Sequence, residues 1–254
     1  MFRKALAVVA LVAAPAVAQQ ANDSAYTALI KAALQDPRIS TELVDHLPAS
    51  ATVPTPLKFH GRIVGAIGEL TYSKDINRYL EAIARAAPTR AKYWVLGKSE
   101  EGRDMIVFVV GSEEQIRNLD QQKAALAALT DPRKTTEADA RRLIASTKPI
   151  YWLTRGMHST ETGGPEMLQE LAYRLVVEET PFIQNIRNNV LVMITPVIEP
   201  DGREKQVDTY YFNKKRARTD ARLPLMYWGK YVQHDNNRDH IGQLLNLSKV
   251  VTKQ

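Results

Sequence analysis

The sequence has 254 residues, of which 44% are hydrophobic and 24% charged, a composition typical of a folded globular chain and unlike that of a disordered one. The formal net charge of +6 is mild, and the basic residues are scattered apart from a cluster at 214–218, so we expect no nucleic-acid partner. The sequence contains no cysteine, which excludes disulfides and thiolate metal ligands.

The first 18 residues have the pattern of a secretory signal peptide. Arg3 and Lys4 form a charged start, and residues 5–14 form an apolar run that is too short for a comfortable membrane span. Residues 16–18, Ala-Val-Ala, fit an A-x-A cleavage site. The pattern predicts an exported protein, periplasmic or extracellular, with no membrane span after cleavage; the rival interpretation is an uncleaved N-terminal anchor.

Residues 19–68 are predicted to be a lead-in segment with little structure of its own. The stretch begins polar and contains several prolines, although residues 26–34 have the weak apolar stripe of a short helix. His46 and His60 lie here without an acidic or histidine neighbour at a useful spacing, so we assign them packing or surface roles. The main domain is then expected to cover 69–254.

The next elements are helices that flank a β-hairpin. Ser73 is a good N-cap, and the helical spacing that follows it stops at Pro88. Apolar runs at 93–96 and 105–110, joined by a turn at 97–103, predict two antiparallel strands. Apolar spacing also predicts helices over 116–129 and 138–145.

Strands and helices alternate after residue 150. Buried strands are predicted at 150–153 and 190–194, with a helix from Pro165 to about Glu179 between them, and 203–230 read as irregular. This alternation predicts an α/β fold: a mixed parallel and antiparallel sheet with helices on both faces, in an α/β/α sandwich.

His158 and Glu161 follow the strand at 150–153 directly. Open α/β sheets place their chemistry at such strand ends, and a nitrogen and an oxygen ligand suit Zn²⁺. The alternative is a histidine that caps the loop and a glutamate that forms an ion pair with the next helix. A catalytic zinc needs three protein ligands, so this pair alone is incomplete.

The second candidate site is Asn237-Arg238. An arginine can hold a carboxylate with two hydrogen bonds and an adjacent asparagine can donate another, as recognition of a peptide C-terminus requires; a surface ion pair with a neighbouring aspartate is the alternative. Arg216 and Arg218 could polarise a carbonyl or form a solvated basic loop. His240 is assigned a packing or surface role.

Four segments in order resemble the zinc carboxypeptidases, the carboxypeptidase A-like metallopeptidases. Residues 158–166 resemble the zinc-binding motif, and 97–103 the G-x-S-x-E-G-R hairpin turn. Residues 195–202 are similar to the N-P-D-G turn, with Glu199 where asparagine is usual, and 234–239 resemble the D-x-N-R substrate segment. The resemblance covers roughly Ser73 to Asp239.

The resemblance implies that His158 and Glu161 are the first two zinc ligands, that Asn237 and Arg238 bind the substrate's terminal carboxylate, and that Arg218, with Arg216 as second choice, stabilises the oxyanion. It also implies an α/β/α sandwich. The family's third zinc ligand, its tyrosine and its general-base glutamate lie further along than residue 254. We therefore expect 69–254 to be the N-terminal part of a catalytic domain that continues beyond this sequence.

The sequence thus predicts an exported zinc metallocarboxypeptidase that hydrolyses peptide bonds near a free C-terminal carboxylate, with these 254 residues inactive on their own. Thr160 stands where many members carry a substrate-binding arginine, so peptide recognition is expected to differ in detail. The alternatives are a non-catalytic module that binds peptide C-termini, a cell-wall peptide amidase or endopeptidase of the same family, and an unstable product.

Overall fold

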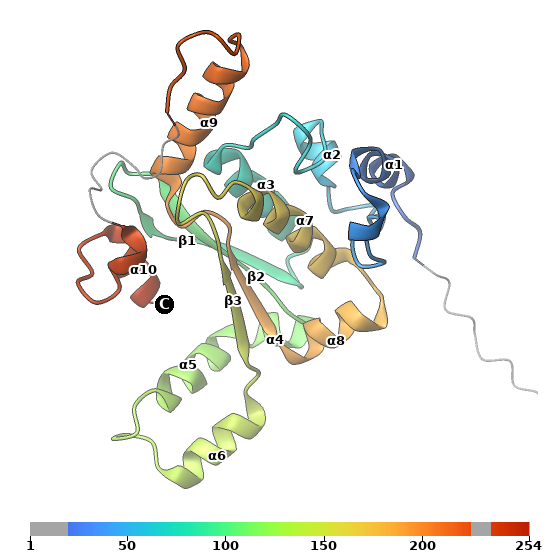
Figure 1. Cartoon of the computed structure of the whole chain (residues 1–254). Helices are drawn as coiled ribbons and strands as arrows, with labels where there is room; N and C mark the ends of the chain where they lie inside the picture. Colours follow the sequence, from blue (N-terminus) through green and yellow to red (C-terminus); the bar gives the residue numbers. More distant parts are fainter. Residues whose placement is uncertain (1–19, 225–234, 254) are drawn as a thin grey trace, which may run out of the picture.

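The protein is built on one four-stranded mixed sheet, which a computed structural model describes over residues 20–224 and 235–253 (Figure 1). The strands are β1 (Ala91–Lys98), β2 (Asp104–Val110), β3 (Ile150–Thr154) and β4 (Leu191–Thr195). Their order across the sheet is β1-β2-β4-β3. β1 and β2 form the predicted hairpin, β2 and β4 pair antiparallel, and β3 and β4 pair parallel, which confirms the mixed sheet.

The parallel pair places the ends of β3 and β4 side by side. The register runs from Ile150 opposite Leu191 to Thr154 opposite Thr195, so both strands stop at the same level. The loops that follow them therefore meet at one edge of the sheet, where open α/β folds form their sites.

Helices surround this sheet. They are α1 (Ser24–Ala33), η1 (Pro37–Ile39), α2 (Pro56–His60), α3 (Ser73–Ala86), α4 (Glu113–Arg117), α5 (Leu119–Leu129), α6 (Glu137–Ser146), α7 (Gly163–Val177), α8 (Pro181–Asn189), α9 (Pro200–Lys214), η2 (Asn236–Arg238) and α10 (Asn246–Thr252). In Figure 1, α5 and α6 project from one end of the body and α9 from the other. None of the helices in the described part of the chain is both long and apolar enough to cross a lipid bilayer.

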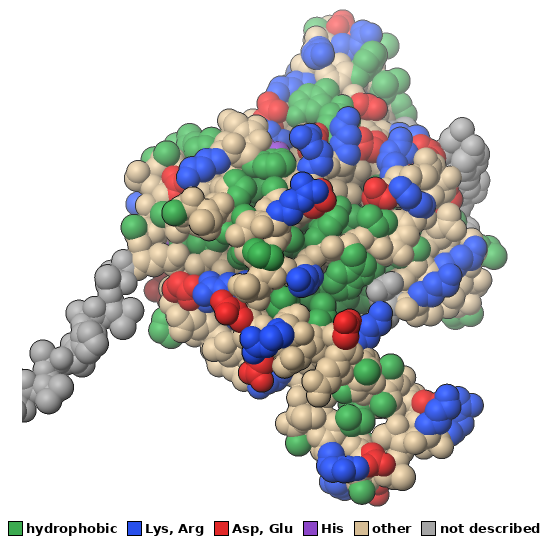
Figure 2. Space-filling model, turned by 180° about the vertical axis from the view of Figure 1, so that it is seen from behind, with side chains coloured by type: hydrophobic (Ala, Val, Ile, Leu, Met, Phe, Trp, Pro, Cys, Tyr) green, Lys and Arg blue, Asp and Glu red, His purple; other side chains and the backbone are tan. Residues whose placement is uncertain are grey.

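The main core lies between α3, α7 and one face of the sheet. It includes Ile106 and Phe108 of β2, Ile194 of β4 and Leu168 of α7, all at most 1% exposed. The other face of β2 carries Val107, which packs with residues of α4 and β4 in a smaller cluster. Figure 2, the view from behind, shows hydrophobic side chains gathered across the middle of the molecule.

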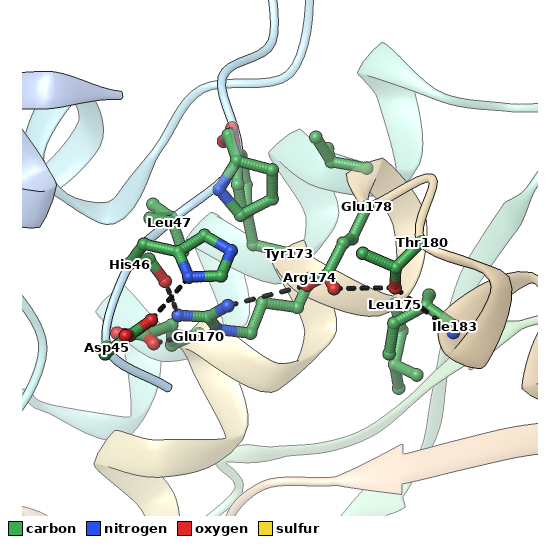
Figure 3. Close-up of polar contacts among 12 residues, drawn as sticks. Asp45, His46, Leu47, Glu170, Tyr173, Arg174, Leu175, Glu178, Thr180 and Ile183 are labelled. Carbon is green, nitrogen blue, oxygen red and sulfur yellow. Dashed lines mark hydrogen bonds and ion pairs between the residues drawn. The ribbon is translucent and has the colours of Figure 1, made fainter. Parts of the chain in front are cut away.

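Residues 20–68 are more ordered than the sequence predicted. They contain α1, η1 and α2, and Tyr26, Leu47 and Val53 are buried in the main core. Polar contacts also tie this segment to α7: the Tyr173 hydroxyl donates to the Pro48 carbonyl at 2.8 Å, and Arg174 donates to the His46 carbonyl (Figure 3). The segment therefore packs as part of the globular body.

The expectation of an irregular stretch from residue 203 was wrong for its first part, because α9 runs to Lys214. Its buried positions include Arg203, Gln206 and Thr209, so the inward face lacks the apolar periodicity that marks a helix in sequence. The predicted helix over 116–129 is also interrupted, since α4 ends at Arg117 and α5 begins at Leu119.

Candidate metal and carboxylate site

The loop after β3 is shaped by a glycine with a left-handed backbone. Gly156 has φ +65°, and a Cβ there would lie 3.2 Å from Pro165 Cγ and 3.3 Å from Val197 Cα. The loop is bonded to the chain that follows β4, since the Ile198 and Glu199 amides donate to the carbonyls of residues 155 and 156 at 2.9 and 3.1 Å. The two strand-end loops thus form one connected unit.

His158 and Glu161, the predicted metal pair, lie together at the end of this loop. His158 Nδ1 is 2.7 Å from Glu161 Oε1, and His158 Nε2 is 3.1 Å from Asp235 Oδ1. Burial lowers the pKa of His158, but the hydrogen bonds and charges of the two carboxylates outweigh burial and hold this pKa above its usual value. Each ring nitrogen therefore faces a carboxylate.

This arrangement fits a histidine that ligates a metal. Such a histidine almost always gives its second ring N–H to a carboxylate or carbonyl, which fixes its tautomer and orientation. Asp235 is placed for that role at Nε2, which leaves Nδ1 on the same side as the Glu161 carboxylate. Sequence reasoning missed this use of Asp235, for which its position two residues before the predicted Asn237-Arg238 pair was the available signal.

The predicted substrate segment is fixed beside the metal loop. Asp235 caps η2 by accepting from the Asn237 amide at 2.9 Å, and the buried Asn236 donates from Nδ2 to the Met157 carbonyl at 2.6 Å. Asn237 and Arg238 are exposed next to these anchors. The structure thus brings both predicted pairs to one place; His234, the first residue of the motif, lies outside the described residues.

The structure does not bring Arg216 and Arg218 to this place. Both are exposed beyond Lys214, the last residue of α9, and the Arg216 guanidinium lies 4.1 Å from the centre of the Phe212 ring. Since α9 starts beside the loop and has 15 residues, its far end is about 22 Å away along the helix axis. The oxyanion role of either arginine stays a prediction.

The turn after β4 and the hairpin turn between β1 and β2 are joined through Asp201. This buried carboxylate accepts from Ser99 Oγ at 2.7 Å, from the Glu101 amide at 3.0 Å and from Arg103 Nη1 at 2.8 Å. Two motifs a hundred residues apart in sequence therefore form one support under the site, which explains why both turns carry polar residues.

Glu199 caps α9 in the same turn by accepting from the Gly202 amide at 2.8 Å. Its side chain is buried, and burial is the main cause that raises its pKa to about 7, against the opposing effect of the Gly202 amide. The sequence indicated only a substitution for asparagine at this position and gave no sign of a carboxyl that titrates near neutral pH.

The donor set fits part of a zinc site. Among residues 20–224 and 235–253, no three His, Cys, Asp or Glu side chains are placed to hold one metal ion together. His158 and Glu161 supply one nitrogen and one oxygen, with Asp235 behind the histidine, where a catalytic zinc takes three protein ligands. The described residues can therefore supply two of the three protein ligands that a catalytic zinc takes.

A comparison with protein families gives a match to the zinc carboxypeptidase family over residues 76–246, about two thirds of the sequence. The chain belongs to the zinc carboxypeptidase family. The match contains β1 to β4, the metal pair and the Asn237-Arg238 segment, so the family resemblance predicted from four motifs is confirmed. A comparison with curated proteins found no match.

Several solved carboxypeptidase structures are also similar to this zinc carboxypeptidase-family chain. Carboxypeptidase A from Helicoverpa armigera is 15% identical, with 90% of this chain and 47% of that chain covered and a TM-score of 0.45. A metallo-carboxypeptidase from Burkholderia cenocepacia is 20% identical, with 53% and 28% covered and a TM-score of 0.37. The chain spans less than half of the length of each of these structures.

Proposed function

We propose that this chain carries two zinc ligands and the carboxylate-binding segment of an exported metallocarboxypeptidase that hydrolyses peptide bonds near a free C-terminus. The observation that supports this most directly is the row of contacts from Asp235 through His158 to Glu161. It joins the metal loop to the segment that carries Asn237 and Arg238, which is the pairing of functions that a carboxypeptidase requires.

Each residue has a defined task in this proposal. His158 and Glu161 hold the metal, and Asp235 accepts the Nε2 proton of the histidine so that Nδ1 keeps its lone pair. Zinc, when bound, polarises a carbonyl and lowers the pKa of a bound water. The exposed Arg238 offers a planar fork to the substrate carboxylate, and Asn237 adds an amide donor.

A third protein ligand is proposed to come from outside the described residues. Among the described residues only His158 and Glu161 are proposed to hold the metal, so we expect this pair without a further ligand to bind zinc weakly and not to support peptidase activity. Export is proposed from the signal-peptide pattern of residues 1–18, which lie outside the described residues.

Zinc titration tests the metal part of the proposal. Isothermal calorimetry of the wild-type chain should show one weak Zn²⁺ site, and His158→Ala and Glu161→Ala should each weaken it at least about 10-fold, because each removes a ligand. His240→Ala is the matched control, since His240 is an exposed histidine outside the Asp235–His158–Glu161 row. Equal zinc affinity in all four proteins would refute the proposed site.

Peptide binding tests the carboxylate part. A short peptide with a free C-terminus should bind the zinc-loaded chain more tightly than its amidated form, and Arg238→Ala should remove that preference, because charge-assisted hydrogen bonds contribute about 1.5–3 kcal/mol. A preference that survives both chelation and His158→Ala would instead favour the non-catalytic binding module. No preference for the free C-terminus would contradict both.

A further inference from the structure

A buried ion pair lies behind the metal loop and has no task in the proposed chemistry. Arg203 of α9 is 1% exposed and Glu166 of α7 is 4% exposed. Arg203 Nη2 donates to Glu166 Oε1 at 2.6 Å. Two charges taken out of water in this way need close, complete hydrogen bonding to be tolerated.

The pair is completed by the backbone and hydroxyl of Thr71. Glu166 accepts from the Thr71 amide and from Thr71 Oγ1, both at 2.7 Å. Arg203 donates from Nε and Nη2 to the Thr71 carbonyl at 3.0 and 2.9 Å. Thr71, two residues before α3, is thus bonded at both its backbone amide and its carbonyl. These bonds connect it to the first turns of α7 and α9.

Both members of the pair are also close to the metal loop, Glu166 in sequence and Arg203 in space. Glu166 lies in the first turn of α7, directly after the loop that carries Glu161, and Arg203 Nη1 lies 3.5 Å from the carbonyl of Thr162. On the other side, Arg203 follows Glu199, whose amide bonds the carbonyl of residue 156. The pair therefore joins the end of the metal loop to α9, the helix that follows the segment bonded to the start of the loop.

The expected energetics of the Arg203–Glu166 pair favour a role in positioning the groups around it over a contribution to the overall stability of the fold. A buried ion pair is often no more stabilising than apolar residues of similar volume, but it defines one arrangement of the groups around it. Metal sites depend on such support, because loss of an outer hydrogen bond typically lowers metal affinity 10- to 100-fold.

We propose that the Arg203–Glu166 pair, with Thr71, is a positioning element that sets the metal loop so that His158 and Glu161 face one another. Neither residue touches the metal or the substrate, so both are positioning residues. The inference rests on the proposed zinc function for its purpose, but the order that the pair imposes on the loop can be measured without metal.

The test compares two double variants, each of which neutralises a buried ion pair that includes a residue of α7. Arg203→Met/Glu166→Gln removes the charges behind the loop without leaving one unpaired. The control Arg174→Met/Glu178→Gln neutralises a similarly buried pair at the end of α7, where Arg174 lies 3.5 Å from Glu178 and contacts the N-terminal segment (Figure 3). Arg174 also pairs with Glu170 at 3.0 Å, so this control removes one further ion pair and is the more disruptive of the two double variants. Arg203→Lys is added because it keeps the charge and is expected to fold if the double variant does not.

Hydrogen exchange without metal is the first readout. The amides of residues 198 and 199, which bond the loop carbonyls, should exchange about 10-fold faster in Arg203→Met/Glu166→Gln and less so in Arg203→Lys, while the Arg174→Met/Glu178→Gln control leaves them unchanged. Zinc calorimetry is the second: the Kd should rise about 10-fold in the first variant only.

Equal exchange and equal zinc affinity in the two double variants would overturn the positioning role. A wild-type chain that binds no zinc would refute the proposed function, and the exchange experiment would still decide whether Arg203 and Glu166 order the loop.

Discussion

The stability of the fold should depend on the protonation of Glu199. Burial raises the pKa of this carboxyl to about 7, the Gly202 amide opposes the shift, and the charge of Asp201 adds to it. Lys205 lowers the pKa and Glu100 raises it, to a smaller extent. In the unfolded chain the carboxyl has its usual pKa of 4.5, so folding takes up a proton over the range between these two values.

The sign follows from that difference. A carboxyl whose pKa is higher in the folded state contributes its full stability below pH 4.5 and loses it as the pH rises through about 7. At about 1.4 kcal/mol for each pKa unit, the whole loss is roughly 3 kcal/mol, and about 2.5 kcal/mol of it falls between pH 5 and pH 8. The Glu199→Gln variant keeps a neutral acceptor for the Gly202 amide and should lose this dependence.

Urea unfolding of both proteins at pH 5 and pH 8, followed by circular dichroism, measures the effect. The free energy of unfolding of Glu199→Gln, relative to wild type, should rise by about 2.5 kcal/mol from pH 5 to pH 8. Glu137→Gln is a control, because that side chain is 80% exposed. Parallel pH curves for wild type and Glu199→Gln would refute the reasoning.

Three further substitutions test the fold around the site by the same unfolding assay. Leu47→Ala should cost about 2–4 kcal/mol, because Leu47 is fully buried, while Leu43→Ala, 49% exposed, should cost less than about 0.5 kcal/mol; equal losses would contradict the packing of residues 20–68. Gly156→Ala should destabilise by about 1–3 kcal/mol, because φ is +65° and the new Cβ would crowd Pro165, whereas Gly163→Ala, with nothing within 4 Å, should be close to neutral. Asp201→Ala should cost about 2–4 kcal/mol, because it removes the buried acceptor of Ser99 Oγ, the Glu101 amide and Arg103, and a loss below about 1 kcal/mol would contradict the support role of that turn.

The parts of the fold that followed from the sequence are those with a clear apolar period. Alternation and buried runs marked all four strands, and the stripe of α7 is apolar enough to identify it. The sequence did not indicate α9, because the polar residues Arg203 and Gln206 occupy its buried face, and the Thr71 carbonyl that accepts from Arg203 comes from a distant segment. The sequence did not indicate that residues 20–68 are structured, for a related reason: isolated residues such as Tyr26 and Leu47 pack into a core that is formed mainly by other elements.

In the site, too, the contacts between residues close in sequence could be predicted, and those that depend on tertiary structure could not. His158 and Glu161 are three residues apart on one loop, so their spacing alone indicated that the side chains could meet, and they do at 2.7 Å. Asp235 is 77 residues further along, and no spacing rule connects it to His158. Its place depends on Asn236, which bonds the loop carbonyl of Met157, and therefore on tertiary structure.

The order of residues along the chain does not by itself place Arg216 and Arg218 near the metal loop, because it says nothing of the direction in which the intervening segment runs. Arg216 and Arg218 fall between the turn at 199–202 and the Asn237-Arg238 segment in sequence, and both of those lie at the metal loop in space. An irregular link would have kept the arginines close, but α9 carries the chain about 22 Å outward before they occur. An oxyanion role for Arg218 thus requires the segment after α9 to return to the loop. We expect the charge-reversed variant Arg218→Glu to leave binding of a peptide with a free C-terminus unchanged and Arg238→Glu to abolish it. This result would assign carboxylate recognition to the η2 segment alone.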